Sequence, residues 1–294
     1  MRRYCERRAD CFFLADPPAT AGPGEVRAFA QGLAVRSSYA AVYFPWLLAP
    51  TPAPPSGFVA GVYARTDAQR GVWKPPAGPE ADVRGATGLS HALGTADHET
   101  LNVLGVNTIR AYRGSPLAVW SARTLAAGTE WRYVSVRRLA IFLERSIDEG
   151  TSWAVFEPNG EPLWSRLRLT IDALLTEQWY LGALAGAKAD QAFFVTCDRT
   201  TMTQADINNR HAIVVVGFAP LRPAEFVTLR FSPQDRGQLI SRRGSPGRAG
   251  ADAPGQSVPG RAGHATGGPS TVASIVEAPR AAATDTRWWP SRMA

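Results

Sequence analysis

Short apolar runs of strand length alternate with amphipathic helical patterns along the middle of the chain. Apolar residues recur at the spacing of one helix face from Tyr133 to Glu149, and again after Glu161-Pro162, where proline fits the first turn of a helix. This alternation predicts a mixed α/β fold, a layered sheet with flanking helices. The runs expected to form strands are residues 10–15, 38–46, 109–111, 117–121, 153–157, 192–196, 213–218 and 225–231.

Other stretches carry weaker local signals. Residues 24–34 fit a short helix, whereas the prolines of residues 49–57 predict a loop. His91 and His98 lie in a polar segment that is typical of a surface turn, and a metal site there would need ligands from elsewhere in the chain.

The composition of the chain changes beyond about Gln234. Gly, Pro, Ala, Ser and Arg dominate from there to the end. Such a segment buries too little apolar surface to offset the entropy that is lost on ordering. Residues 235–294 are therefore expected to be a disordered tail.

The basic charge of the chain is concentrated in this tail. Of the formal net charge of +7, the residues after Arg236 contribute +4, because they hold seven arginines and three acidic residues. The rest of the chain is nearly neutral, so its charge does not favour a nucleic-acid-binding domain. We expect no nucleic acid among the partners, and an arginine tail that binds nucleic acid stays as an alternative.

The cysteines and the N-terminal residues indicate the cellular compartment in which the chain is made. Cys5, Cys11 and Cys197 are too few for a disulfide scaffold, so free thiols are expected, although Cys5 and Cys11 could pair in an oxidising compartment. The charged N-terminus has no apolar segment behind it, so a signal peptide is not expected. No stretch approaches the roughly 18 apolar residues of a membrane span. We expect a soluble chain that is made in the cytoplasm.

Catalytic motifs are absent from the sequence. It holds no GxSxG, GxxxxGK[ST], HExxH or CxxC, so we expect no enzyme activity, cofactor or metal. Cys197-Asp198 and His211 flank two expected strands, and a Cys/His-dependent hydrolase is the alternative from another functional class. The carboxylates at expected strand ends are interpreted as loop charges and helix caps, with a cleft as the alternative: Glu157, Asp198, Asp206 and Glu225.

Arginines and tryptophans favour an assembly protein over a small catalyst. Arg137, Arg138 and Arg145 fall on the polar side of the helix expected after Tyr133, where a solvated face is expected. The nine tryptophans are many for this length, and such aromatics mark large packed cores or protein interfaces.

The run from Tyr63 to Ala77, YARTDAQRGVWKPPA, resembles the signature segment of contractile tail sheath proteins of phages and related injection systems. Further segments match that family in the same order, and together they cover roughly Arg3 to Gln234. These segments are Arg84–Ala86, Leu101–Asn102, Gly105–Arg110, Val119–Leu125, Trp131–Val134, Val136–Leu139, Trp153–Asn159, Leu163–Trp164, Gly182–Leu184, Ala192–Val195, Cys197–Asp198 and Ala219–Phe226.

The resemblance implies a structural protein without a cofactor. Sheath subunits of this family stack helically around an inner tube, and contraction after a baseplate trigger drives the tube through a target envelope. The expected partners are therefore other sheath subunits, the inner tail tube protein and the baseplate, without membrane insertion. The chain is expected in the cytoplasm when made, and then in a phage tail or injection-system particle.

The resemblance also implies terminal arms that add strands to a neighbour's sheet. This is β-augmentation, in which main-chain hydrogen bonds hold the two subunits together. The helix that faces the tube is expected among residues 162–185. The inter-subunit arm strand corresponds here to Glu225, Phe226, Val227, Thr228, Leu229, Arg230 and Phe231.

The chain departs from the family pattern at both ends. The segment from Cys5 to Pro18 matches a mid-domain segment, so the fold is expected to be incomplete at the N-terminus and to lack the N-terminal arm. Residues 3–130 are expected to be the remainder of the core domain, and residues 131–234 the C-terminal domain, with the tail after them. A truncated sheath remnant that does not assemble stays as an alternative.

Overall fold

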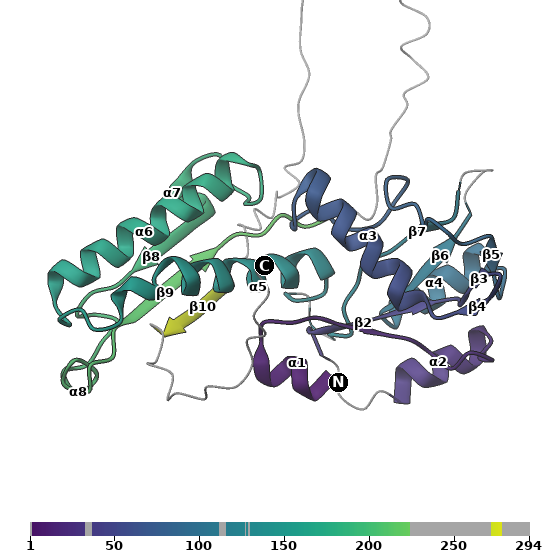
Figure 1. The fold of residues 1–294 in the computed structure, drawn as a ribbon, viewed down its shortest axis with the longest axis horizontal. Coiled ribbons are helices and arrows are strands. Elements are labelled where there is room, and N and C mark those ends of the chain that lie inside the picture. Colours follow the sequence, from purple (N-terminus) through teal and green to yellow (C-terminus); the bar gives the residue numbers. More distant parts are fainter. Residues whose placement is uncertain are drawn as a thin grey trace, which may run out of the picture. The chain divides into compact units, whose positions relative to one another are not determined.

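The computed structural model describes residues 2–32, 37–111, 116–126, 128, 130–223 and 272–277 of the chain. Helices and strands alternate along it (Figure 1), which confirms the predicted mixed α/β class. In chain order the elements are α1 Arg2–Arg8, β1 Phe13–Ala15, α2 Pro23–Gly32, β2 Ala40–Phe44, β3 Leu47–Ala49, β4 Thr51–Ala53, α3 Pro55–Arg70, β5 Gly88–Leu89, α4 Thr95–Val103, β6 Val106–Arg110, β7 Ala118–Val119, α5 Val134–Gly150, the 3₁₀ turn η1 Ser152–Ala154, α6 Glu161–Tyr180, α7 Ala189–Ala192, β8 Phe193–Thr196, α8 Gln204–Asn208, β9 Ile213–Phe218 and β10 Val272–Glu277.

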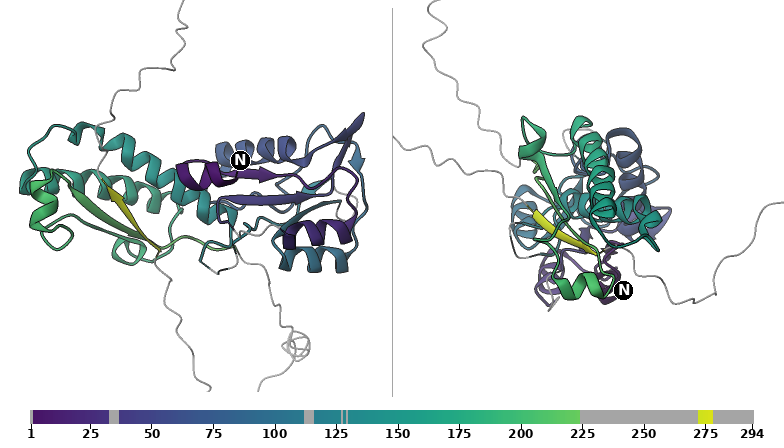
Figure 2. Two further views of the ribbon diagram at one scale, coloured as in Figure 1. Left: turned by 90° about the horizontal axis from the view of Figure 1, so that it is seen from below. Right: turned by 90° about the vertical axis from the view of Figure 1, so that its left-hand side faces the viewer.

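Strands β1, β2, β6 and β7 form one sheet in that order. The first three run parallel, with Phe13 opposite Ala40 and Val42 opposite Val106, and β7 pairs antiparallel with β6. All five residues of β2 are buried, because α3 covers one face of the sheet and α2 with α4 cover the other (Figure 2). A buried apolar strand without alternation is typical of a parallel sheet that is covered on both faces.

A second, smaller sheet has the order β4-β3-β5 with both pairings antiparallel. The prediction of a loop at residues 49–57 is wrong, because these residues hold β4 and the first turn of α3. Helix α3 begins at Pro55, directly after its N-cap residue Pro54. Proline suits a first helical turn, since its fixed φ matches the helix and its missing N–H would have no partner there.

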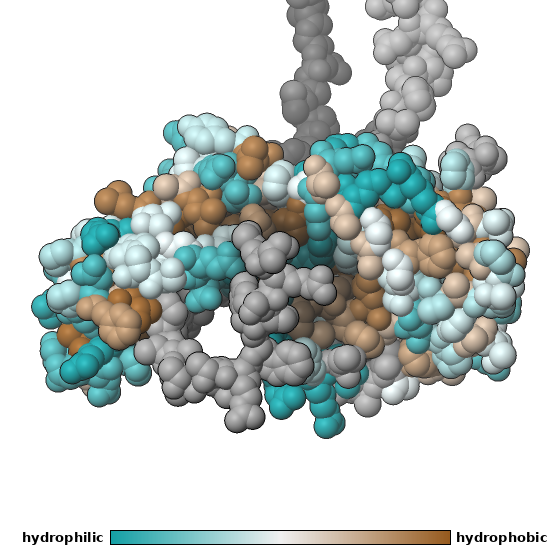
Figure 3. Space-filling view, in the orientation of Figure 1, coloured by the Kyte–Doolittle hydropathy of each residue, from teal (hydrophilic) through white to brown (hydrophobic). Residues whose placement is uncertain are grey.

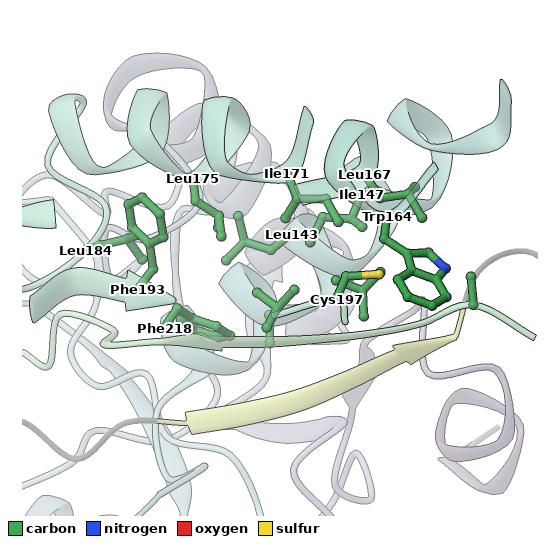
Figure 4. Packing of buried hydrophobic residues seen from close by; sticks show 14 of the residues in the cluster. Leu143, Ile147, Trp164, Leu167, Ile171, Leu175, Leu184, Phe193, Cys197 and Phe218 are labelled. Carbon is green, nitrogen blue, oxygen red and sulfur yellow. The ribbon is translucent and has the colours of Figure 1, made fainter. Parts of the chain in front are cut away.

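The third sheet is antiparallel and has the order β10-β9-β8. Helices α5 and α6 confirm the two predicted helical patterns, and together with β8 and β9 they enclose one apolar cluster (Figure 4). Trp164, Leu167 and Ile171 of α6 each expose only 1% of their surface. The periodic apolar face of α6 therefore packs as the sequence predicts.

The prediction of a strand at residues 153–157 is wrong. Residues Ser152–Ala154 form the turn η1 between α5 and α6, and Ala154 is buried in the cluster between these helices. Phe156 has a left-handed backbone with φ of 78°. A short apolar run does not distinguish a strand from a buried turn, because it is too short to show a period.

Of the helices in the described ranges, none combines the length and the apolar character that crossing a membrane requires.

A tight turn ends α3 inside the segment Tyr63–Ala77. Gly71 has φ of 93° and ψ of 159°, a conformation open essentially to glycine alone. A Cβ atom at this position would clash with the indole ring of Trp73, which packs against the cluster under α5 and α6. Both the backbone and the close approach of Trp73 therefore require glycine.

The Gly71→Ala variant is expected to unfold at a lower denaturant concentration, with a loss of about 1–3 kcal/mol from backbone strain. Gly61→Ala is the matched control, because Gly61 lies in the exposed interior of α3 with no atom within 4 Å of the position that a Cβ would take. That control is expected to gain about 0.5–1 kcal/mol. Equal effects of the two substitutions on equilibrium unfolding would contradict the special role of Gly71.

Candidate assembly interface

Strand β9 is the central strand of the third sheet, and α5 and α6 hold it in place from one side. Val214, Val216 and Phe218 are at most 3% exposed and belong to the apolar cluster beneath the two helices. Strand β8 pairs along one edge, with Phe193 opposite Phe218 and Thr196 opposite Val215. Beyond β9, the Ala219 N–H donates to the Ala192 carbonyl at 2.8 Å. This edge of β9 is therefore occupied by β8, the strand that precedes it in the chain.

The other edge of β9 pairs with β10. The register is antiparallel over six residues, from Val272 opposite Phe218 to Glu277 opposite Ile213. The sequence predicts disorder for the whole of residues 235–294, but residues 272–277 of that tail form this strand (Figure 2). The expected arm strand, residues 225–231, lies outside the described residues. The structure thus shows that the outer edge of β9 takes an added strand.

Gly217 lets a side chain of β8 lie across β9. A Cβ atom on Gly217 would clash with the Phe194 ring, which is 43% exposed. The ring therefore lies directly over the glycine backbone. This face of the sheet, opposite the helices, presents an aromatic side chain to the surroundings.

Large apolar side chains are exposed on and around α6. Leu169 is 70% exposed, Tyr180 77%, and the adjoining Leu181 57%. Phe156, in the loop before α6, is 96% exposed on its left-handed backbone. Brown apolar residues also interrupt the polar surface in the face drawn in Figure 3. A contiguous patch of such side chains marks a surface that contacts another protein, whereas single exposed apolar residues are common on any protein surface.

An open groove of about 1130 Å³ lies among α3, α5 and residues 10–14. Its apolar lining includes Phe142, which is 38% exposed. Its charged lining residues pair with oppositely charged neighbours. The groove is therefore not a binding site selective for anions or for cations. The pairs are Arg8–Asp10, Asp67–Arg138, Arg70–Glu80 and Arg145–Glu149.

The expectation that Arg137 and Arg138 lie on a solvated face is wrong. The guanidinium groups of Arg137 and Arg138 stack on aromatic rings, at 3.6 Å from the Trp131 centroid and 4.6 Å from the Tyr63 centroid, respectively. Arg138 also donates two hydrogen bonds to Asp67 of α3, at 2.9 and 2.5 Å. These contacts tie α5 to α3 and to the segment Tyr63–Ala77, so they support the fold.

The hydrolase hypothesis required an accessible Cys197 beside His211. Cys197 is completely buried in the apolar cluster, whereas His211 is exposed. Burial raises the pKa of the Cys197 thiol to about 11. At neutral pH the sulfur is therefore protonated and shielded, which is the opposite of what a cysteine nucleophile requires.

Cys197 is accordingly expected to resist alkylation by iodoacetamide at pH 7 to 8 in the folded chain and to react after unfolding in urea. Mass spectrometry of the labelled peptides measures this directly. Cys11, which is only half-buried, serves as the internal comparison. Rapid labelling of Cys197 in the folded chain would contradict its burial.

The carboxylates that were candidates for a cleft act as local caps and ion-pair partners where the structure describes them. Asp206 accepts hydrogen bonds from the N–H and hydroxyl of Thr203 in a capping box, and these hydrogen bonds lower its pKa. Asp198 accepts from the hydroxyl and N–H of Thr200, which lowers its pKa as well. Glu157 lies 3.7 Å from Arg166. Glu225 lies outside the described residues.

The prediction of a surface turn around His98 is wrong. His98 lies in α4, and its Nδ1 is 2.6 Å from the hydroxyl oxygen of Thr108 on β6. Burial lowers the pKa of His98. The side chain therefore joins α4 to β6. Across the described part of the chain, His, Cys, Asp and Glu residues form no group of three that could hold a metal ion.

Two family models match consecutive parts of the chain. The model for the phage tail sheath protein central domain matches residues 1–125, and that for the phage tail sheath C-terminal domain matches residues 126–233. Together they cover nearly all of the residues that the structure describes, apart from β10.

Among curated proteins, the tail sheath protein of Vibrio phage KVP40 is 27% identical over 178 residues. The alignment covers 60% of this chain and 26% of that protein. A putative prophage major tail sheath protein of Pseudomonas aeruginosa is 32% identical over 109 residues, which cover 35% of this chain and 27% of the relative. The chain therefore spans about a quarter of the length of these curated relatives.

Solved structures agree with these matches. The baseplate of the anti-feeding prophage in the contracted state contains a chain that is 37% identical, with a TM-score of 0.69 over 78% of this chain and 67% of that chain. The contracted sheath complex of an extracellular contractile injection system, PVC, is 38% identical, with a TM-score of 0.68 over 76% and 63% of the two chains.

Proposed function

The chain belongs to the phage tail sheath protein family, and from this premise we propose that it is a structural subunit of a contractile sheath. Such subunits would assemble helically around an inner tube and contract to drive the tube through a target envelope. The family is one of structural proteins, and the buried, protonated Cys197 gives no support to the alternative of a Cys/His hydrolase.

The observation that carries this proposal is the outer edge of β9. An edge strand offers a row of unpaired N–H and C=O groups, and a strand from another molecule can pair with them. In the structure that edge pairs over six residues with β10, whose sequence position is remote from β9. The buried side chains of β9 pack against α5 and α6. The main-chain N–H and C=O groups of β9 are therefore held in place for pairing with another strand.

Within this proposal, residues 225–231 are the arm strand that pairs with a neighbouring subunit. The alternation of Phe226, Thr228 and Arg230 with more apolar residues suits a strand with one polar face. Main-chain hydrogen bonds would connect the subunits whatever side chains the arm carries, because such bonds do not depend on side-chain identity. Residues 3–130 and 131–234 are proposed as the two sheath domains.

The proposed partners are other sheath subunits, the inner tube and the baseplate. Helix α6 is the proposed tube-facing helix, and its exposed Leu169 and Tyr180 are consistent with a protein contact. The solved relatives come from a contracted sheath and from a baseplate, which supports the same two kinds of assembly for this chain. The proposed location is the cytoplasm during synthesis and then the assembled particle.

Proline substitutions in the arm test this proposal. The purified full chain is expected to form large species as its concentration rises, measured by sedimentation velocity. The variant Val227→Pro/Thr228→Pro is expected to stay monomeric, because proline removes ladder donors from a strand. Ala282→Pro/Ala283→Pro is the matched control and is expected to assemble normally. A full chain that stays monomeric would support the alternative of a non-assembling remnant, and unchanged assembly of the arm variant would exclude residues 225–231 as the arm.

A further inference from the structure

Strand β10 lies outside the part of the chain that resembles the family. The two family models end at residue 233, whereas β10 spans Val272–Glu277. Its pairing with β9 is nevertheless regular, with all six residues of each strand in register. The strand thus lies beyond the residues that the family models match, and it occupies the outer edge of β9.

The connection between β9 and β10 is unlike that of a hairpin. Neighbouring antiparallel strands are usually joined by about 2–5 residues, and the turn then fixes their register. Here residues 219–271 separate the two strands. Closing a longer loop costs more entropy, so a strand that is joined through such a connection is easier to displace than one held by a tight turn.

The two edges of β9 can each hold one strand. Strand β8 occupies one edge, and the β8–β9 pair is supported by the apolar cluster under α5 and α6. Strand β10 occupies the other edge. An incoming strand can therefore pair with β9 only after β10 has left.

We propose that β10 is an intramolecular cap on β9, which a strand from a second copy of this chain displaces during assembly. This inference rests on the proposed sheath function. Strand β10 would keep β9 from pairing with other strands in isolated subunits, and β10 would itself be the edge strand of the sheet. The cap would also set the concentration at which assembly begins, because β10 and the incoming strand compete for the same main-chain groups.

The change in assembly concentration depends on the fraction of molecules in which β10 is not paired with β9. If β10 is paired in nine of ten molecules, the apparent affinity of an incoming strand is about tenfold weaker than for an open edge. Removal of the cap is then expected to lower the critical concentration for assembly about tenfold, which corresponds to about 1.4 kcal/mol.

The test uses the full chain and the variant Ser274→Pro/Ile275→Pro. Alternate residues of a strand direct their N–H groups to a given neighbour, so one of two adjacent prolines must remove a donor from the β9–β10 ladder. Ala282→Pro/Ala283→Pro is the matched control in the same tail. The first measurement is binding of a labelled synthetic peptide with the sequence of residues 271–278, followed by fluorescence anisotropy.

The peptide is expected to bind the Ser274→Pro/Ile275→Pro variant about tenfold more tightly than the full chain or the control. Hydrogen exchange at residues 213–218 is expected to rise in this variant and to fall again when the peptide binds. Equal peptide affinity for all three proteins would overturn the cap, as would unchanged exchange in β9.

The second measurement is the critical concentration for assembly by sedimentation. The Ser274→Pro/Ile275→Pro variant is expected to assemble at a concentration about tenfold lower than the full chain. A variant that binds the peptide tightly but forms no assembly at any concentration would refute the proposed sheath function. In that case β10 would still be a displaceable cap on β9, but β9 would not serve sheath assembly. A variant that assembles only at the concentration of the full chain would refute the cap and leave the sheath function intact.

Discussion

Replacing Trp164 with alanine is expected to lower the free energy of unfolding by about 3–5 kcal/mol. Trp164 is 1% exposed, and its indole N–H donates to the Asn159 side-chain oxygen at 2.7 Å. The substitution removes the largest side chain of the cluster that supports β9, and it leaves both a cavity and an Asn159 side-chain oxygen without its indole donor. Urea unfolding followed by circular dichroism measures this loss without relying on tryptophan fluorescence.

The matched control for Trp164→Ala is Leu169→Ala on the same helix. Leu169 is 70% exposed, so its truncation is expected to change the free energy of unfolding by no more than about 0.5 kcal/mol. If Trp164→Ala costs no more than this control, the cluster under α5 and α6 does not support the third sheet as described.

Removing either partner of the Asp67–Arg138 ion pair is expected to lower the free energy of unfolding by about 1.5–3 kcal/mol. The Arg138 side chain is 16% exposed and the Asp67 side chain 32%, and two hydrogen bonds join them. Hydrogen bonds between charged, partly buried groups are stronger than surface ion pairs, and Arg138 also stacks on Tyr63. Asp67→Asn, Arg138→Met and the double variant form a double-mutant cycle in urea unfolding.

The control for this cycle is Glu149→Ala on the same helix α5. Glu149 pairs with Arg145 at 2.9 Å, but their side chains are 66% and 57% exposed. Surface pairs of this kind contribute about 0–1 kcal/mol, so a small effect is expected. If the effects of Asp67→Asn and Arg138→Met simply add in the double variant, the pair does not couple α3 to α5.

The helices and central strands of the C-terminal part were predictable because their apolar periodicity is strong. Helix α5 was expected at Tyr133–Glu149 and lies at Val134–Gly150, and β9 lies at the expected residues 213–218. In contrast, α3 was not predicted. It begins with proline and contains Gly57 and Gly61, which lower helix propensity, although its buried Val59, Val62 and Tyr63 give it one apolar face.

Long-range contacts decided the features that the sequence did not reveal. The hydroxyl of Tyr39 accepts a hydrogen bond from Arg137, 98 residues away, and this contact with the stacking on Trp131 explains how an arginine of α5 is buried. Likewise, the pairing of β10 with β9 joins residues that are more than 50 positions apart, within a tail whose composition predicts disorder. Local patterns carry no information about such partners.

Electron microscopy would show whether this chain assembles as a sheath subunit. The purified full chain would be concentrated and viewed by negative staining, alone and together with its cognate tube protein. Rings or tubes are expected from the chain alone, and a sheath that surrounds the tube is expected when the tube protein is present. A soluble monomer or an amorphous aggregate under both conditions would refute the proposed sheath function and identify the chain as a sheath fragment that does not assemble.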